Sequence, residues 1–159
     1  MSDYEFVTRW SVRAPVEAVW ALIAKAEDWP SWWQGVEKVE LLSPGGNGQV
    51  GSLRRFTWKS RLPYRLTFNM RTTLFEPPAR LEGLAEGELQ GSGAWRLTAD
   101  GEWTRVRYDW RVATNKAWMN LLAPIARPLF AWNHDVVMGW GAEGLARRLG
   151  CEVKIEPES

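Results

Sequence analysis

The sequence predicts an α+β fold, in which a curved antiparallel sheet of about seven strands wraps around a long C-terminal helix. Two short helices are expected after the first strand. Apolar residues recur every three or four positions between 117 and 149, the period of a helix with one buried face. Upstream, segments of alternating apolar and polar residues are separated by Gly, Pro, Asn and Asp. Short connections of this kind join antiparallel strands.

The first strand and the two short helices occupy the N-terminal part of the chain. Residues 4–13 alternate apolar and polar side chains, as in a half-buried strand. Pro15 favours the first turn of a helix that ends near Lys25. A second short helical turn is expected at Ser31, whose hydroxyl can cap it.

Six further strands are expected before the long helix. Their predicted ranges are 36–42, 50–59, 64–75, 80–89, 93–99 and 103–113. The turns between them fall at 43–48, 62–63, 77–78, 91–93 and 100–101, where turn-forming residues gather. In the strand 64–75, alternation predicts an apolar side made of Leu66, Phe68, Met70 and Leu74.

The helix predicted for residues 117–149 would be about 50 Å long. Its large apolar residues form one stripe, which we expect to face the sheet: Trp118, Leu122, Ile125, Leu129, Trp132, Val136 and Trp140. His134 lies about 160° from the centre of this stripe on a helical wheel, so it is expected to point away from the sheet. Pro124 and Pro128 predict a kink or break near the start of the helix.

Length and charge limit the possible partners. A chain of 159 residues is expected to form one domain, 1–159, with 152–159 as a flexible tail. Its 20 basic and 19 acidic residues give a net charge of +1, which supplies no field for nucleic acid. A small or neutral partner fits this balance better.

The single cysteine and single histidine restrict the chemistry further. Cys151 cannot form an internal disulfide, and one Cys with one His cannot make the usual zinc sites, so no metal or cofactor is expected. The sequence has no signal-type segment and no run of 18 apolar residues. We therefore expect a cytoplasmic protein without stable membrane insertion.

The inner faces of the sheet and helix form a candidate site for a hydrophobic ligand. Its predicted residues are Arg54, Phe56, Trp58, Phe68, Met70, Gly83, Ala85, Trp95, Tyr108 and Trp110 on strands, and Leu129, Trp132, Asn133, Val136 and Trp140 on the helix. The chain has 12 tryptophans, which suit either an aromatic core or a pocket that stacks against rings. Small residues such as Gly83 and Ala85 can leave a void, or they can pack closely against large neighbours.

Polar candidates within this site are few. Arg54 shares a strand face with Phe56, so it could bind a ligand carboxylate or enolate. It could also extend to solvent at the strand end or pair with a carboxylate at the rim. Tyr108 could bind a ligand oxygen or act as an acid, or its hydroxyl could have a structural partner. Asn133 could offer its amide to a ligand carbonyl or to the protein. No phosphate loop and no nucleophile elbow is present, and the catalytic residues, if any, are not identified.

Four segments carry a family resemblance. They are WSVRAPVEAVWALI at 10–23, EDWPSWW at 27–33, FEPPARL at 75–81 and WNHDVVMGWGAEGLARRL at 132–149. With the order of elements, they resemble the SRPBCC superfamily, which has the START-like or helix-grip fold. Within it, the chain looks most like the bacterial polyketide cyclase/dehydrase and lipid-transport group. The resemblance implies a hydrophobic cavity under the long helix, and it supplies no catalytic residues.

Three functions remain open. The first is binding or carrying a hydrophobic small molecule, such as a lipid, a quinone or a polyketide-like compound. The second is a polyketide cyclase, aromatase or dehydratase, which would also need a positioned acid and base. The third and weakest is a protein-interaction module that exposes Trp29, Trp32 and Trp33 as an apolar patch. Neither the ligand nor the oligomeric state follows from the sequence.

Overall fold

The computed structural model describes residues 3–46, 49–63, 65–114, 121 and 123–156. Its elements are β1 (Asp3–Val12), α1 (Val16–Ala24), the 3-10 helix η1 (Ala26–Ser31), β2 (Val36–Ser43), β3 (Leu53–Lys59), β4 (Arg65–Glu76), β5 (Arg80–Gly87), β6 (Leu89–Asp100), β7 (Trp103–Thr114), α3 (Ala123–Leu149) and β8 (Val153–Glu156). This order confirms the predicted α+β fold, with one strand more than expected.

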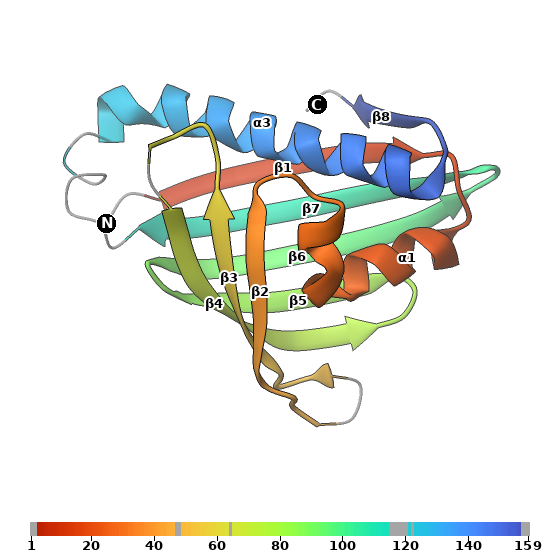
Figure 1. The fold of residues 1–159 in the computed structure, drawn as a ribbon, viewed down its shortest axis with the longest axis horizontal. Coiled ribbons are helices and arrows are strands. Elements are labelled where there is room, and N and C mark those ends of the chain that lie inside the picture. Colours follow the sequence, from red (N-terminus) through yellow and green to blue (C-terminus); the bar gives the residue numbers. More distant parts are fainter. Residues whose placement is uncertain (1–2, 47–48, 64, 115–120, 122, 157–159) are drawn as a thin grey trace.

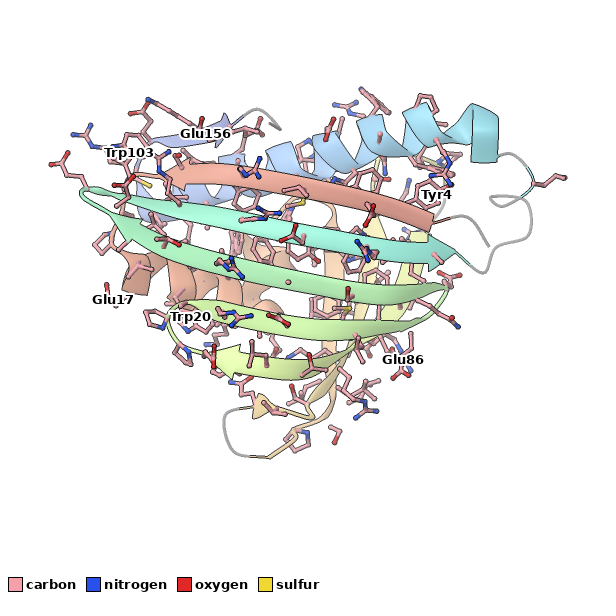
Figure 2. The ribbon with its side chains drawn as sticks, turned by 180° about the vertical axis from the view of Figure 1, so that it is seen from behind. Tyr4, Glu17, Trp20, Glu86, Trp103 and Glu156 are labelled. Carbon is pink, nitrogen blue, oxygen red and sulfur yellow. The ribbon has the colours of Figure 1, made fainter. Side chains whose placement is uncertain are left out.

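The strands form one antiparallel sheet in the order β2-β3-β4-β5-β6-β7-β1-β8. Figure 1 shows the curved sheet, with α3 running alongside β1 and α1 lying at one end. The outer face of the sheet carries charged side chains (Figure 2), among them the Arg71–Glu86 ion pair between β4 and β5. None of the described helices combines the length and apolarity needed to cross a membrane.

The extra strand lies in the segment predicted to be a flexible tail. Residues of β8 pair with β1, with Glu156 opposite Arg9. The Ser11 hydroxyl donates a hydrogen bond of 2.7 Å to the Glu156 carboxylate. The prediction of a flexible tail is therefore wrong for residues 153–156, while 157–159 lie outside the described residues.

Two details of the strands differ from the predicted pattern. The hairpin between β5 and β6 turns at Glu88, after Gly87 with φ +110°, and not at 91–93. In β4, a register shift between Thr72 and Leu74 puts Leu74 opposite Glu82 and Phe75 opposite Leu81. The inner face of β4 therefore continues with Thr72 and Phe75, and the inward placement of Leu74 was wrong.

The face of α3 that packs on the fold is the opposite of the predicted one. Phe130, Met138, Ala142 and Leu145 are buried, whereas Leu129 is 47% exposed and Trp132 is 48% exposed. Val136 and Trp140 are half-buried. The side chains of Trp118, Leu122 and Ile125 lie outside the described residues. The helix runs without a break from Ala123 to Leu149, through Pro128.

Glycines explain this orientation of α3. A Cβ atom at Gly141 would lie 2.7 Å from a ring atom of Trp33, and one at Gly144 would overlap the Trp32 carbonyl oxygen. The helix therefore approaches the tryptophans through its smallest residues. The sequence pattern does not reveal such a contact, because it identifies the buried face of a helix only from the positions of large apolar residues.

The tryptophan corner after α1 belongs to the core. Trp29, Trp32 and Trp33 are 7%, 4% and 2% exposed. The Trp33 indole N–H donates to the Val137 carbonyl at 2.9 Å, which ties the corner to α3. The exposed apolar patch that an interaction module would need is not formed by these rings, so that alternative is wrong.

Candidate functional site

A cavity of about 190 Å³ lies between the inner face of the sheet and α3. It is larger by more than tenfold than the space of roughly 10–15 Å³ that one water needs. Of the predicted site residues, those that line it are Arg54, Phe56, Trp58, Phe68, Met70, Gly83, Trp95, Tyr108, Trp110 and Asn133. The inner rings therefore do not fill the fold completely.

The other predicted site residues lie elsewhere. Ala85 is buried in the core and does not line the cavity. Leu129, Trp132, Val136 and Trp140 belong to the other side of α3, and none of them lines the cavity. Their placement in the site was wrong, because the helix packs through its small residues.

Several lining residues were missed. On α3 they are His134, Val137 and Met138. His134 was expected to point away from the sheet. It does lie opposite the predicted stripe, as the helical wheel indicated. However, the side of α3 opposite the stripe is the one that faces the cavity. On the sheet, Phe75 was hidden by the register shift in β4, whereas Thr72 is in phase with Phe68 and Met70 but is polar.

Aromatic rings form the wall of the cavity along the sheet. Trp95 stacks on Tyr108 with ring centroids 4.1 Å apart and 26° between the planes. Phe68 lies 5.6 Å from Trp110 and 6.0 Å from Phe56. This wall presents ring faces and edges from β3, β4, β6 and β7 to a ligand.

The glycines in the sheet support these rings. Gly83 and Gly93 are cross-strand partners, and Gly93 is also paired with Trp110. A Cβ at Gly93 would lie 2.8 Å from the Tyr108 hydroxyl oxygen and 3.1 Å from the Trp110 ring. The space that Gly93 leaves is thus taken up by aromatic packing, and the void lies beyond the rings.

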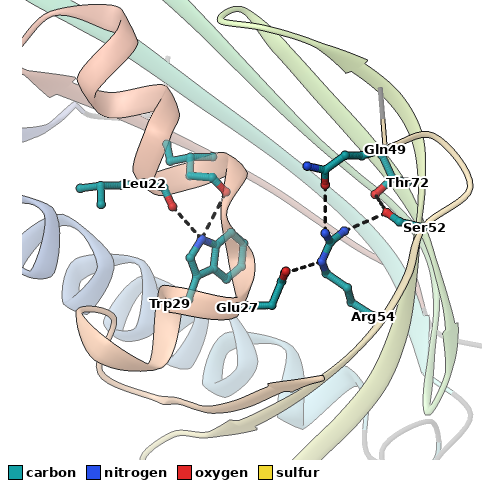
Figure 3. Close-up of polar contacts among 8 residues, drawn as sticks. Leu22, Glu27, Trp29, Gln49, Ser52, Arg54 and Thr72 are labelled. Atoms are coloured by element: carbon teal, nitrogen blue, oxygen red, sulfur yellow. Dashed lines mark hydrogen bonds and ion pairs between the residues drawn. The ribbon is translucent and has the colours of Figure 1, made fainter. Parts of the chain in front are cut away.

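Arg54 is held in a polar network beside the cavity (Figure 3). Its Nε donates to Glu27 Oε1 at 2.5 Å, its Nη1 to Ser52 Oγ at 2.8 Å and its Nη2 to Gln49 Oε1 at 2.9 Å. Ser52 Oγ in turn donates to Thr72 Oγ1 at 3.1 Å. The Arg54 side chain is 12% exposed. The guanidinium is therefore positioned and already neutralised by a carboxylate.

In this structure Arg54 pairs with a carboxylate, which is one of the alternatives left open by the sequence. Glu27 belongs to η1, which lies outside the strands. A comparison of strand faces in the sequence could not find this partner, because the approach of η1 to β3 is a tertiary contact.

His134 and Asn133 form the polar part of the helix wall. The His134 ring stacks on Phe6 with centroids 4.3 Å apart and 14° between the planes. Removal from water lowers the pKa of His134 to about 4, so the imidazole is neutral near pH 7. Asn133 Oδ1 is buried without a hydrogen-bond partner among the described residues.

Tyr108 and Trp58 add neutral polar groups on the sheet side. Burial raises the pKa of the Tyr108 hydroxyl, which therefore remains protonated at physiological pH. Trp58 Nε1 is buried and has no hydrogen-bond partner in the described part of the chain. Within that part, no three His, Cys, Asp or Glu side chains gather closely enough to hold a metal ion.

Residues 4–150 match the family model described as polyketide cyclase / dehydrase and lipid transport. The chain belongs to this family. The match confirms the resemblance to the polyketide cyclase group of the SRPBCC superfamily that four segments of the sequence indicate.

A curated relative agrees with this assignment. The actinorhodin polyketide synthase bifunctional cyclase/dehydratase of Streptomyces coelicolor is 28% identical over 114 residues, which are 65% of this chain and 33% of that protein. This chain thus spans only about a third of that relative's length.

The solved structures show the fold. The Zhui aromatase/cyclase from Streptomyces sp. R1128 has a TM-score of 0.76 at 19% identity, with 94% of each chain covered. A START superfamily protein from Mycobacterium smegmatis has a TM-score of 0.75 at 13% identity, with 92% of this chain and 97% of that chain covered. The helix-grip, START-like architecture of this family member is thereby confirmed.

Proposed function

We propose that this protein binds and carries a hydrophobic small molecule in the cavity between the sheet and α3. The observation that carries the proposal is the cavity of about 190 Å³ with its wall of stacked aromatic rings. Concave, mostly apolar pockets with a few polar groups are the usual form of small-molecule sites. Flat aromatic or polyketide-like compounds fit the wall best, and lipids and quinones are the alternative ligands.

A second candidate function is cyclisation or dehydration of a polyketide-like ligand in the same cavity. The Streptomyces coelicolor relative is a bifunctional cyclase/dehydratase, which favours this candidate. The cavity also holds an imidazole and a phenol, groups that can move protons during such a reaction. His134 and Tyr108 are the residues to test for this role.

Binding can be tested with a variant that fills the cavity. Val137 lines the cavity and the adjacent Val136 does not, so Val137→Trp should block a planar apolar probe such as naphthalene, while Val136→Trp should leave binding intact. Quenching of tryptophan fluorescence during titration reports the dissociation constants, and native mass spectrometry of fresh protein reports any retained ligand. Naphthalene binding that survives Val137→Trp unchanged would contradict the proposed site.

The enzymatic candidate needs a separate readout. Turnover of a poly-β-ketone substrate should fall in His134→Phe and Tyr108→Phe, with naphthalene affinity retained. Binding of the substrate without turnover by the wild-type protein would reject the enzyme and leave the carrier.

A further inference from the structure

Two buried polar atoms of the cavity wall have no partner within the described chain. Asn133 Oδ1 can only accept a hydrogen bond, and Trp58 Nε1 can only donate one. Buried polar atoms are almost always paired in folded proteins, so unpaired ones in a cavity wall indicate that something else satisfies them. Here that partner would be a molecule in the cavity.

The two atoms belong to one neighbourhood. Trp58 packs edge-on against Trp33 with centroids 5.3 Å apart. The Trp33 indole donates to the carbonyl of Val137, one helical turn after Asn133. An acceptor on α3 and a donor on β3 thus belong to the wall of one cavity, and they do not bond to each other.

His134 extends this set with a neutral ring. Its stacking on Phe6 fixes the plane of the imidazole, and His134 itself lines the cavity. With a pKa of about 4, the ring carries one N–H donor and one nitrogen acceptor at neutral pH. Among the described residues, neither ring nitrogen has a hydrogen-bond partner.

The charged part of the wall offers little to an anion. Arg54 already binds the Glu27 carboxylate and the side chains of Ser52 and Gln49. A ligand carboxylate would have to displace the Glu27 carboxylate from Arg54. The number of ion pairs would then be the same with and without the ligand.

From these contacts, we infer that the cavity selects an uncharged ligand with both a hydrogen-bond donor and an acceptor, as in a phenol or enol near a ketone. His134 is a specificity-determining residue for that polar edge. The inference rests on the proposed binding function and names the chemical class of its ligand. A carboxylate-bearing lipid is the class that it disfavours.

Four probes of nearly equal shape test this inference: naphthalene, 2-naphthol, 2-acetonaphthone and 2-naphthoate. The wild-type protein should bind 2-naphthol and 2-acetonaphthone about tenfold more tightly than naphthalene, as expected for one additional satisfied hydrogen bond. It should bind 2-naphthoate no more tightly than naphthalene. Fluorescence titration at pH 7.5 gives all four dissociation constants.

Two variants test whether His134 causes the preference for 2-naphthol over naphthalene. His134→Phe should keep the affinity for naphthalene and lose most of the preference for 2-naphthol. Trp132→Phe, on the outer side of the same helix, is the control and should leave all four dissociation constants unchanged. The wild-type series remains decisive even if His134→Phe fails to fold.

Each contrary result would have a different consequence for the inference and for the proposed function. Equal binding of naphthalene, 2-naphthol and 2-acetonaphthone would overturn the inference and leave the binding function standing. Preferred binding of 2-naphthoate, lost in Arg54→Met, would overturn it in favour of an anionic ligand. Failure of all four probes to bind would overturn the proposed function as well.

Discussion

Gly144 of α3 packs so closely on Trp32 that a Cβ atom at this position would overlap the Trp32 carbonyl oxygen. The long helix is therefore docked on the backbone of the tryptophan corner and not only on its rings. This contact sets which side of α3 faces the cavity, and hence which side chains a ligand meets.

Gly144→Ala is expected to destabilise the fold by about 2 kcal/mol or more, because the added methyl forces α3 away from Trp32. The control is Gly139→Ala in the same helix, where a Cβ would meet only Ile155 Cδ1 at 4.0 Å. That change should be neutral or stabilising by up to about 1 kcal/mol. Urea unfolding measures both, and equal effects would contradict the close contact at Gly144.

The orientation of α3 predicts a second contrast. Met138 is 5% exposed and Trp132 is 48% exposed. Met138→Ala should cost about 2–5 kcal/mol of unfolding free energy, whereas Trp132→Ala should cost less than about 1 kcal/mol although it removes the larger side chain. Thermal or urea unfolding distinguishes them. The reverse order would restore the orientation that the hydrophobic stripe predicts.

The sequence predicted most of the sheet but not the side of α3 that packs on it. Alternation placed Phe56, Phe68 and Trp95 correctly, because a strand has only two faces and one of them is polar. The register shift that brings Phe75 inward leaves no such signal. On α3 both sides are apolar over several turns, so the periodicity favoured the larger residues and put His134 outside. Only the fit of glycines against the tryptophans decides between the two faces.

His134 predicts a pH dependence of stability. Its pKa is about 4 in the folded protein and about 6.5 in the unfolded chain, so the unfolded state binds the proton more readily between these values. The free energy of unfolding should therefore fall by up to about 3 kcal/mol as the pH drops from about 6.5 to about 4. At higher pH this contribution is fully present.

His134→Phe isolates that contribution from the titration of carboxylates. The loss of stability between pH 7 and pH 4.5 should be smaller in the variant than in the wild-type protein, as measured by urea unfolding at both values. Parallel losses in the two proteins would show that folding does not lower the pKa of His134.

The last prediction concerns the pairing of Arg54 with Glu27. Glu27→Gln keeps the size of the side chain but removes the charge that neutralises a guanidinium with 12% of its side chain exposed. Because Glu27 itself is 37% exposed, the loss of stability should be modest, about 1 kcal/mol. With Arg54 freed, the variant should bind 2-naphthoate about fivefold more tightly than the wild-type protein does, the equivalent of about 1 kcal/mol.

Glu102→Gln is the control, since Glu102 pairs with Arg13 where both side chains are mostly exposed. It should alter neither the stability nor the 2-naphthoate affinity. Unchanged 2-naphthoate affinity in Glu27→Gln would mean that the guanidinium does not reach the ligand, whereas a gain would show that Glu27 is what keeps the cavity selective for uncharged molecules.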